Sequence, residues 1–333
     1  MVARSIPMKT LKIAYHPNPR LQPLMDGTVK LEGFKIDWTI ANAADMHGRH
    51  LNENAFDVFE FSISNLLITK DMPERAHLRW KAIPMHLMRC DFFYDLHVRR
   101  DSGIRSFADL KGKKLGMPDY QMTAAVWLRI MLGKLYGIRP QDISWVNGRN
   151  RAHTHGAGVA ENLAPGIHLR RLTEGETLND ALHKGEIDAA LGDAISCRLT
   201  AGGEVERLPM TVAKQMCSEL TAKTGLRPVN HALLIQEDLV AQHPELPMLL
   251  YEACEKSKIE AYARAPDSAA SLMIFPELYF ADNAAAFGED PYPSGFRTNR
   301  HVVEAIRDEL LLEQLTRKKI EVDSLFVPST LGT

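Results

Sequence analysis

The feature that most constrains this chain is an alternation of short strand-like runs with helix-like runs. In the first hundred residues, "LKIAYH", "FKIDWTI" and "FDVFEFS" show the apolar pattern of strands, and "ADMHGRHLNEN" has the pattern of a helix. A second alternating series extends from "DSGIRSFADLKGKKLGM" to "GEIDAAL". Strands that alternate with helices favour an α/β fold with largely parallel sheets.

The chain length divides this pattern into two units. At 333 residues the chain exceeds the size at which one compact core is usual. We predict one lobe from residues 1–100 together with 227–280, and a second lobe from residues 101–226. The chain then crosses between lobes twice, near residues 99–101 and 226–230. Residues 281–333 are predicted to form a C-terminal loop and helix that wrap onto the first lobe.

Composition excludes several classes of function. The net charge is -2, and no run of Lys or Arg dominates any segment, so nucleic acid is not an expected partner. No segment approaches the roughly 20 apolar residues of a membrane span, and the N-terminus lacks the apolar region of a signal peptide. We expect a soluble, cytoplasmic protein. Cys90, Cys197, Cys217 and Cys254 are widely spaced and indicate reduced thiols rather than a disulfide framework.

The expected ligand site lies at the carboxyl ends of the strands. In an open α/β sheet a ligand binds there, and in a two-lobed version it binds between the lobes. This rule selects loops rather than helices. They are His16–Arg20, Glu60–Ser64, Pro84–Arg89, Pro118–Thr123, Asp193–Ser196 and Asn230–His231.

One of these loops, in "GMPDYQMTAAVWLR", suggests an anion site. A strand-like run ends at Pro118, and a short polar turn opens into a helix near Thr123. The first N–H groups of a helix and its dipole suit a carboxylate, although Thr123 could equally act as a helix cap. A dianion needs more positive charge, which Arg20 or Arg89 could supply as a bidentate fork. Each arginine could instead be a surface residue with a buried stem.

Four residues are candidates for proton transfer. His86 lies between apolar neighbours at the end of a strand-like run, so it is either functional or a satisfied core residue. His16 and His231 are weaker candidates of the same type. Glu60 alternates with Phe59 and Phe61 and therefore points to the opposite side of its strand, where it could be a buried carboxylate with a raised pKa.

Two histidine pairs allow a metal site as a minority interpretation. His153 and His155 share one face if their segment is extended, but zinc usually needs at least three protein ligands, and Asp119, Glu60 or His86 would have to supply the third. His47 and His50 are explained as well by exposure to solvent. The motifs GxGxxG, GxxxxGK[ST] and GxSxG do not occur, which disfavours a nucleotide site and a serine nucleophile elbow.

Several stretches together resemble the 4,5-dihydroxyphthalate decarboxylase family. They are "LMDGTVKLEG", "FDVFEFSISNLL", "DSGIRSFADLKGKKLGMPDYQMTAAVWLR", "GEIDAAL" and "DPYPSGFRTNR". "PDYQMTAAVW" and the last stretch point to the decarboxylase branch, whereas "ADLKGKKLG" and "GEIDAAL" are common in the wider superfamily. The segment "PMHLMRCDFFYD" departs from the family pattern, and only Arg89 in it corresponds. The resemblance implies a two-lobed fold of the type II periplasmic solute-binding class, with a ligand cleft between lobes.

The resemblance also implies non-oxidative decarboxylation of a small aromatic dicarboxylate, 4,5-dihydroxyphthalate, to 3,4-dihydroxybenzoate by acid–base catalysis. We expect no organic cofactor, and we expect the chain to form a homo-oligomer. The candidate residues divide by role into a catalytic set, His86, Glu60, His16 and His231, and a substrate-binding set, Arg20, Arg89, Asp119, Tyr120, Gln121, Met122, Thr123, Ser62 and Ser64. A non-catalytic binding protein for an aromatic carboxylate is the main alternative, disfavoured by the missing export signal. A relative of the thiamine-pyrimidine synthases is a third, disfavoured because their Cys-rich signature is absent.

Overall fold

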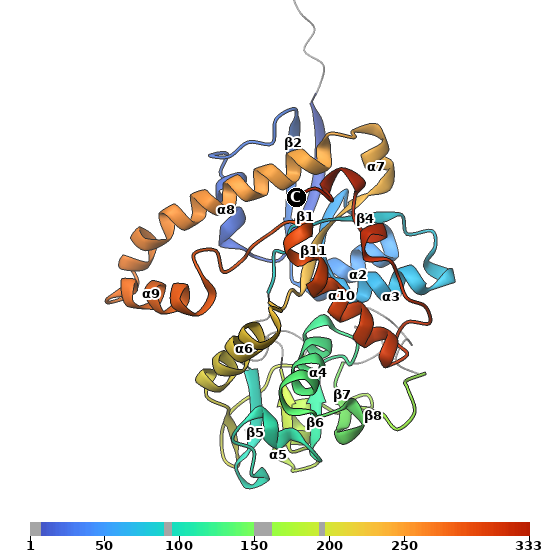
Figure 1. The fold of residues 1–333 in the computed structure, drawn as a ribbon, viewed down its shortest axis with the longest axis vertical. Helices are drawn as coiled ribbons and strands as arrows, with labels where there is room; N and C mark the ends of the chain where they lie inside the picture. The colour runs from blue at the N-terminus through green and yellow to red at the C-terminus, as the bar shows by residue number, and fades with distance from the viewer. Residues whose placement is uncertain (1–7, 90–94, 150–161, 193–196) are drawn as a thin grey trace, which may run out of the picture.

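The computed structural model describes residues 8–89, 95–149, 162–192 and 197–333. Two β-sheets lie at opposite ends of the molecule, with helices between and around them (Figure 1). This two-sheet α/β arrangement confirms the predicted fold class.

The first sheet has the strand order β2-β1-β3-β11-β4. Its strands are β1 (Lys9–Tyr15), β2 (Phe34–Ile40), β3 (Val58–Ser62), β4 (Trp80–Ile83) and β11 (His231–Gln236). The first three are mutually parallel, and β11 runs antiparallel between β3 and β4. Because β11 is antiparallel, its amino end lies at the same sheet edge as the carboxyl ends of β1 and β3. That edge gathers residues from three distant parts of the sequence.

The second sheet has the order β10-β5-β9-β6-β7-β8. Its strands are β5 (Leu96–Arg99), β6 (Lys114–Met117), β7 (Ser144–Asn147), β8 (His168–Arg171), β9 (Ala189–Leu191) and β10 (Val205–Arg207). Strand β5 pairs with β9 and β10. The prediction that residues up to 100 belong with the first sheet is therefore wrong for 96–99, and the chain passes between the sheets before Leu96.

The helices follow local capping signals. They are α1 (Gln22–Met25), α2 (Ala43–Glu53), α3 (Ile63–Asp71), α4 (Thr123–Tyr136), α5 (Leu178–His183), α6 (Met210–Thr224), α7 (Glu237–Gln242), α8 (Leu246–Ala270), α9 (Pro276–Phe287) and α10 (Phe296–Leu312). The side chain of Asn42 accepts a hydrogen bond from the Asp45 N–H at the start of α2, and Ser62 does the same for α3. Helix α4 ends at Gly137, whose φ of 64° suits glycine.

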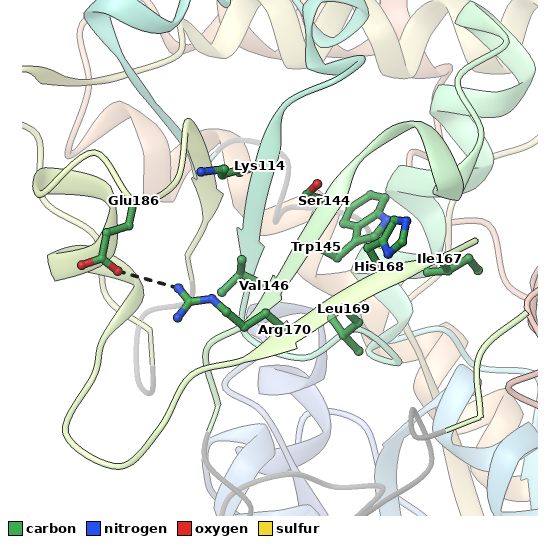
Figure 2. A pocket seen from close by; sticks show the side chains of 9 residues that line it. All are labelled: Lys114, Ser144, Trp145, Val146, Ile167, His168, Leu169, Arg170 and Glu186. Carbon is green, nitrogen blue, oxygen red and sulfur yellow. Dashed lines mark ion pairs between the residues drawn. The ribbon is translucent and has the colours of Figure 1, made fainter. Parts of the chain in front are cut away.

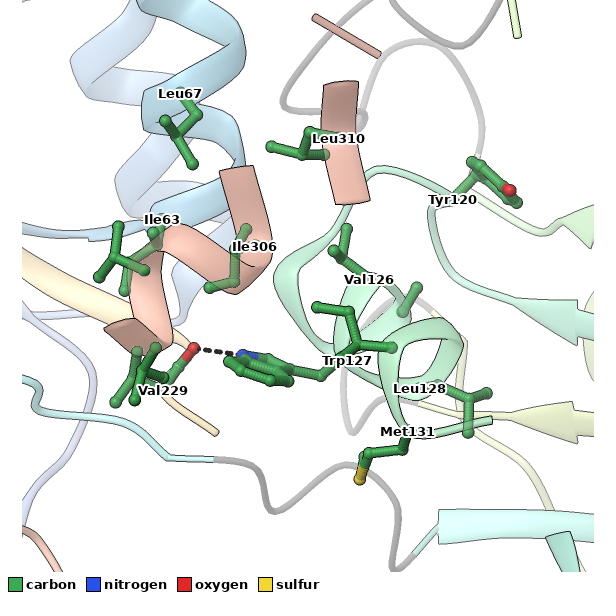
Figure 3. Close-up of a cluster of buried hydrophobic side chains, with 14 of the residues drawn as sticks. Ile63, Leu67, Tyr120, Val126, Trp127, Leu128, Met131, Val229, Ile306 and Leu310 are labelled. Carbon is green, nitrogen blue, oxygen red and sulfur yellow. Dashed lines mark hydrogen bonds between the residues drawn. The ribbon is translucent and has the colours of Figure 1, made fainter. Parts of the chain in front are cut away.

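Helix α10 joins the two halves instead of wrapping onto the first lobe alone. It packs against α3, which directly follows strand β3 of the first sheet, and against α4 of the second half. Figure 3 shows Trp127 of α4 in this shared core, where its indole N–H donates to the carbonyl of Val229 over 2.8 Å. Ile306 and Leu310 of α10 lie in the same hydrophobic cluster. The predicted placement of residues 281–333 therefore needs correction, because α10 contacts both halves.

Two chemical expectations can be compared with the described residues. Cys197, Cys217 and Cys254 are buried thiols, whereas Cys90 lies outside the described ranges. Within those ranges, no helix has the length and apolar character that a bilayer crossing requires.

Candidate active site

A cavity of about 340 Å³ lies at the carboxyl ends of β1 and β3. Its lining comes from the turn after β1, from Glu60 on β3, from the segment after β4, and from two tyrosines near the C-terminal helices. The lining residues are His16, Pro17, Asn18, Pro19, Arg20, Glu60, Leu87, Met88, Arg89, Tyr262 and Tyr292. The volume is within the usual range for small-molecule sites. The structure thus brings together His16, Arg20, Glu60 and Arg89 from the predicted set.

Glu60 is fixed by hydrogen bonds to both of its carboxylate oxygens. Its Oε1 accepts from His231 Nδ1 at 2.7 Å, and its Oε2 accepts from the backbone N–H of His16 at 2.9 Å. Both side chains are almost completely buried. The antiparallel pairing of β11 with β3 places His231 at the level of Ser62, which brings the imidazole to the end of the strand that carries Glu60. The result is an oriented carboxylate–imidazole pair at the cavity.

Arg20 reaches the cavity from the turn after β1. Asn18 shapes this turn, since its Oδ1 accepts from the Arg20 N–H at 3.0 Å and its Nδ2 donates to the Leu87 carbonyl at 2.9 Å. The Arg20 guanidinium also donates to the Leu87 carbonyl and lies 3.7 Å from the ring centre of Tyr292. Stacking on the ring holds the guanidinium plane while leaving positive charge beside the cavity.

Arg89 holds the cavity wall together. Its Nη1 donates to the Arg227 carbonyl at 3.0 Å, and its Nη2 donates to the Pro293 carbonyl at 2.6 Å and to Asn299 Oδ1 at 3.0 Å. Pro293 and Asn299 belong to the "DPYPSGFRTNR" stretch. This arginine therefore adds positive charge to the cavity and also organises the loop that covers it.

Sequence reasoning missed the two tyrosines of the lining. Tyr262 donates to Asp290 Oδ1 at 3.3 Å, and burial, followed by the charge of Asp290, raises the pKa of this phenol. Asp290 also accepts from Lys258 Nζ at 2.7 Å and from the Tyr292 N–H at 2.9 Å. The family stretch that contains Tyr292 could have indicated it. Tyr262, in the middle of α8, carried no local signal.

His86 does not join the cavity. It lies beyond the end of β4, is 1% exposed, and its Nδ1 donates to the His231 carbonyl at 3.2 Å. Burial, followed by the charge of Arg89, lowers the pKa of His86 to about 3. A histidine that stays neutral near pH 7 does not exchange protons there, which argues against the catalytic role predicted for His86.

His47 and His50 are buried, so exposure to solvent, the alternative to a metal site, does not explain them. The His47 ring lies 5.4 Å from the ring of His231 and 4.6 Å from that of Phe61. The His50 ring stacks on Phe59 at 3.6 Å, and burial lowers its pKa to about 3. His47 thus packs behind the Glu60–His231 pair, and His50 belongs to the core.

The predicted anion site at the start of α4 is buried. Thr123 is the first residue of α4 rather than its cap, and its hydroxyl lies 2.8 Å from that of Ser62 and 3.0 Å from that of Ser64. It also accepts from the Ser64 N–H at 3.1 Å, and the Ser64 hydroxyl donates to the Gln121 carbonyl at 2.6 Å. These hydroxyls connect α3 with α4. We call Ser62, Ser64 and Thr123 the hydroxyl cluster.

The neighbours of the hydroxyl cluster are also engaged inside the protein. Asp119 accepts from Asn147 Nδ2 at 3.0 Å and from Gln121 Nε2 at 3.2 Å. The Tyr120 ring packs edge-on against Trp145, with the ring centres 5.6 Å apart. Met122 caps α4 without a side-chain hydrogen bond. None of the residues from 119 to 123 lines the 340 Å³ cavity, which argues against their predicted role in binding substrate.

A second, more open cavity of about 760 Å³ lies on the other sheet (Figure 2). Lys114, Ser144 and His168, which line it, are the first residues of β6, β7 and β8. Arg170 crosses it to form an ion pair with Glu186 at 3.7 Å. Because ligands in open α/β sheets bind at the carboxyl ends of strands, this amino-terminal position is the less suitable one.

The metal interpretation depends on residues outside the described ranges. His153 and His155 lie in the segment 150–161, of which the structure describes nothing. Among the described residues, no three His, Cys, Asp or Glu side chains are close enough to hold a metal ion.

Solved structures support the fold. The periplasmic aliphatic sulphonate-binding protein of Escherichia coli aligns with a TM-score of 0.57 at 14% identity, over 98% of this chain and 99% of that chain. The alkanesulfonate-binding protein of Xanthomonas axonopodis pv. citri, bound to MOPS, aligns with a TM-score of 0.53 at 15% identity, over 97% of this chain and 99% of that chain. The architecture is therefore that of periplasmic binding proteins.

Sequence relatives identify the family. Residues 91–167 match the family model described as NMT1/THI5 like. A 4,5-dihydroxyphthalate decarboxylase of Pseudomonas putida is 30% identical over 192 residues, which is 58% of this chain and 73% of the relative. A 4,5-dihydroxyphthalate decarboxylase of Comamonas testosteroni is 30% identical over 323 residues, which is 96% of this chain and 97% of the relative. This chain belongs to the 4,5-dihydroxyphthalate decarboxylase family.

Proposed function

We propose that this protein decarboxylates a dihydroxylated aromatic dicarboxylate, converting 4,5-dihydroxyphthalate to 3,4-dihydroxybenzoate and carbon dioxide, in the 340 Å³ cavity. The observation that carries the proposal is the Glu60–His231 pair, with both oxygens of Glu60 oriented, at a cavity that Arg20 also lines. An anionic ring needs a cation to hold it, and proton transfer needs a positioned acid and base. This cavity offers both.

The chemistry uses the ring as its own electron sink. A base takes the proton of the hydroxyl that is para to the departing carboxylate, and an acid adds a proton to the ring carbon bearing that carboxylate. The resulting quinone-like ring loses carbon dioxide as the carbon–carbon bond breaks, and its electrons return to the ring. The phenolate then recovers its proton. One proton is consumed for each carbon dioxide released, and no redox change occurs.

We assign roles from position in the cavity. Glu60, oriented by His231, serves as the base for the phenol, since each carboxylate oxygen keeps acceptor capacity beyond the one bond that it makes. The His16 side chain, which also lines the cavity, serves as the general acid that supplies the proton to the ring carbon. Arg20 binds the carboxylate that remains, and Arg89 contributes charge from the wall. Cytoplasmic location and independence from an organic cofactor are part of the same proposal.

The test is a product assay in heavy water. We expect the purified protein, treated with a chelator, to release carbon dioxide from 4,5-dihydroxyphthalate and to yield 3,4-dihydroxybenzoate with one ring deuterium at the vacated carbon. A second arm with added divalent metal examines the minority interpretation that a metal takes part. Tight binding without carbon dioxide in either arm would contradict the proposal and favour a solute-binding protein for an aromatic carboxylate.

A further inference from the structure

The connection between α8 and α9 exposes a concentration of apolar side chains. Seven large apolar residues within the segment 272–280 have exposed fractions between 40% and 85%. Figure 1 shows this segment at the outer end of the long α8 helix. We call these residues the hairpin tip: Leu272, Met273, Ile274, Phe275, Leu278, Tyr279 and Phe280.

The α9 helix that follows is almost unburied. Pro276 is its one buried residue, although the sequence "PELYFADNAAAF" is largely apolar. A helix that is apolar on most sides normally packs inside a protein or against another chain. Within the described residues α9 packs chiefly on α8. Another surface is needed to cover the rest of it.

The exposed area is large enough for a stable interface. The three aromatic side chains each cover about 150–250 Å² when fully buried, and together with the four aliphatic side chains, at the exposed fractions given above, the hairpin tip presents on the order of 900 Å². The largest apolar patch of a typical monomer is only about 300–600 Å². A standard protein–protein interface buries about 800 Å² on each partner. The hairpin tip therefore exceeds what a monomer usually exposes and matches one side of a stable interface.

The charge around the hairpin tip argues against a lipid partner. The segment 266–290 contains Asp267, Glu277, Asp282, Glu289 and Asp290, and it has no Lys, Arg or His. Segments that lie on anionic membranes carry basic residues around their apolar face, because the lipid surface is negative. Lys214 and Lys258, the bases that pair with Asp282 and Asp290, are engaged in those ion pairs, so the segment offers no basic rim to such a surface.

We propose that the hairpin tip is the surface at which two copies of this chain pair. Most soluble oligomers are symmetric homo-oligomers, in which the same patch on each copy meets its equivalent, and an apolar patch is complementary to itself. The inference goes beyond the proposed decarboxylation and does not depend on it. Pairing would also brace the cavity, since α8 carries the lining residue Tyr262, which donates to Asp290 after α9.

The experiment is sedimentation equilibrium on the purified full chain. The test variant is Ile274→Glu with Leu278→Glu, which changes two residues that are 80% and 68% exposed and so should not disturb folding. The matched control is Ile259→Glu with Leu312→Glu, two residues that are 65% and 68% exposed outside the hairpin tip. Circular dichroism melting of each variant reports the fold.

We expect the wild type and the control to sediment as an even number of chains, and the test variant to have half that mass. Burying unpaired carboxylates should raise the dissociation constant at least about 100-fold. A wild type that is monomeric at about 100 μM, or a test variant with the mass of the wild type, would overturn the proposal. Comigration of monomeric wild type with vesicles of phosphatidylcholine and phosphatidylserine would assign the hairpin tip to a membrane instead.

Discussion

Near the carboxyl end of β3 the Glu60 carboxylate lines a cavity. Just beyond β6, in contrast, the Asp119 carboxylate is enclosed by Asn147 and Gln121. Glu60 lies within β3 near its carboxyl end and Asp119 follows the carboxyl end of β6, the edges where ligands are expected, and both are 1% exposed. The sequence therefore predicts them equally well as site residues. Their difference lies in what surrounds them.

The two regions differ in how their hydrogen-bonding capacity is used. Around Glu60, the cationic side chain of Arg20 and the side chain of His16 line an open volume. Around Thr123, each hydroxyl of the hydroxyl cluster bonds another group of the protein, and the bonds connect α3 with α4. A group committed to holding two elements together is not free to bind a substrate. The first region is thus suited to chemistry, and the second to stability.

The largest predicted effect concerns Glu60→Gln. This substitution keeps the size and a hydrogen-bond acceptor for His231 but removes the base, so turnover should fall by about 10²–10⁴-fold with little change in the Michaelis constant. Steady-state kinetics on 4,5-dihydroxyphthalate measure both. The control is Glu245→Gln, which makes the same change at an exposed Glu–His pair, His243–Glu245, separated by 3.7 Å. Equal turnover in the two variants would remove Glu60 from the mechanism.

The second prediction separates the two arginines of the cavity. Arg20→Lys should raise the Michaelis constant about 10-fold or more with a nearly unchanged melting temperature, since an ammonium cannot reproduce the planar fork. Arg89→Lys should lower the melting temperature as well, because its fork holds two carbonyls and Asn299. Exposed Arg297→Lys serves as the control. The division of roles is wrong if Arg20→Lys lowers stability without affecting the Michaelis constant.

The third prediction addresses the hydroxyl cluster. Thr123→Val leaves the Ser64 N–H without its acceptor and should reduce the free energy of unfolding by about 1–3 kcal/mol, while turnover per folded molecule stays close to that of the wild type. Denaturant titration measures the free energy of unfolding, and steady-state kinetics measure the turnover. Thr298→Val, at an exposed position on α10, is the control. A large loss of turnover with normal stability would instead support substrate binding at the start of α4.

The fourth prediction concerns the pH dependence of stability. The pKa of His86 is lowered to about 3 in the fold, below the ordinary value of 6.5, so the unfolded chain binds more protons between these values. Stability from this group is present above pH 6.5 and is lost as the pH falls toward 3. His86→Gln should reduce the slope of unfolding free energy against pH by up to about 1.4 kcal/mol per pH unit. An unchanged slope in this window, with exposed His301→Gln as the control, would contradict the buried, neutral state.

Much of the fold is predictable from local sequence patterns. Strands β1, β2 and β3 follow from apolar alternation, and α2 follows from its helical pattern. The exception is β5, because its sheet is decided by pairing with Ala189–Leu191, about 90 residues further along the chain. Local pattern identifies such a strand but not its partners.

The candidate site was predictable where it depends on a strand and not where it depends on tertiary packing. Glu60 follows from its alternation with two phenylalanines. Tyr262 could not be predicted in this way, because nothing in the local sequence distinguishes it from the other polar residues of α8. It reaches the cavity only because α8 packs beside the turn after β1. For His86 the sequence leaves the functional and the core interpretations open, and its burial against the His231 carbonyl, which depends on the packing of β11, favours the core interpretation.

The most direct test of the central claim is a crystal structure with phthalate, which keeps both carboxylates but lacks the hydroxyl that the reaction needs. The account predicts that the ring occupies the cavity at the ends of β1 and β3, with one carboxylate on Arg20 and the opposite edge of the ring toward Glu60. Phthalate bound instead against Gln121 and Thr123, with the hydroxyl cluster opened around it, would contradict the account.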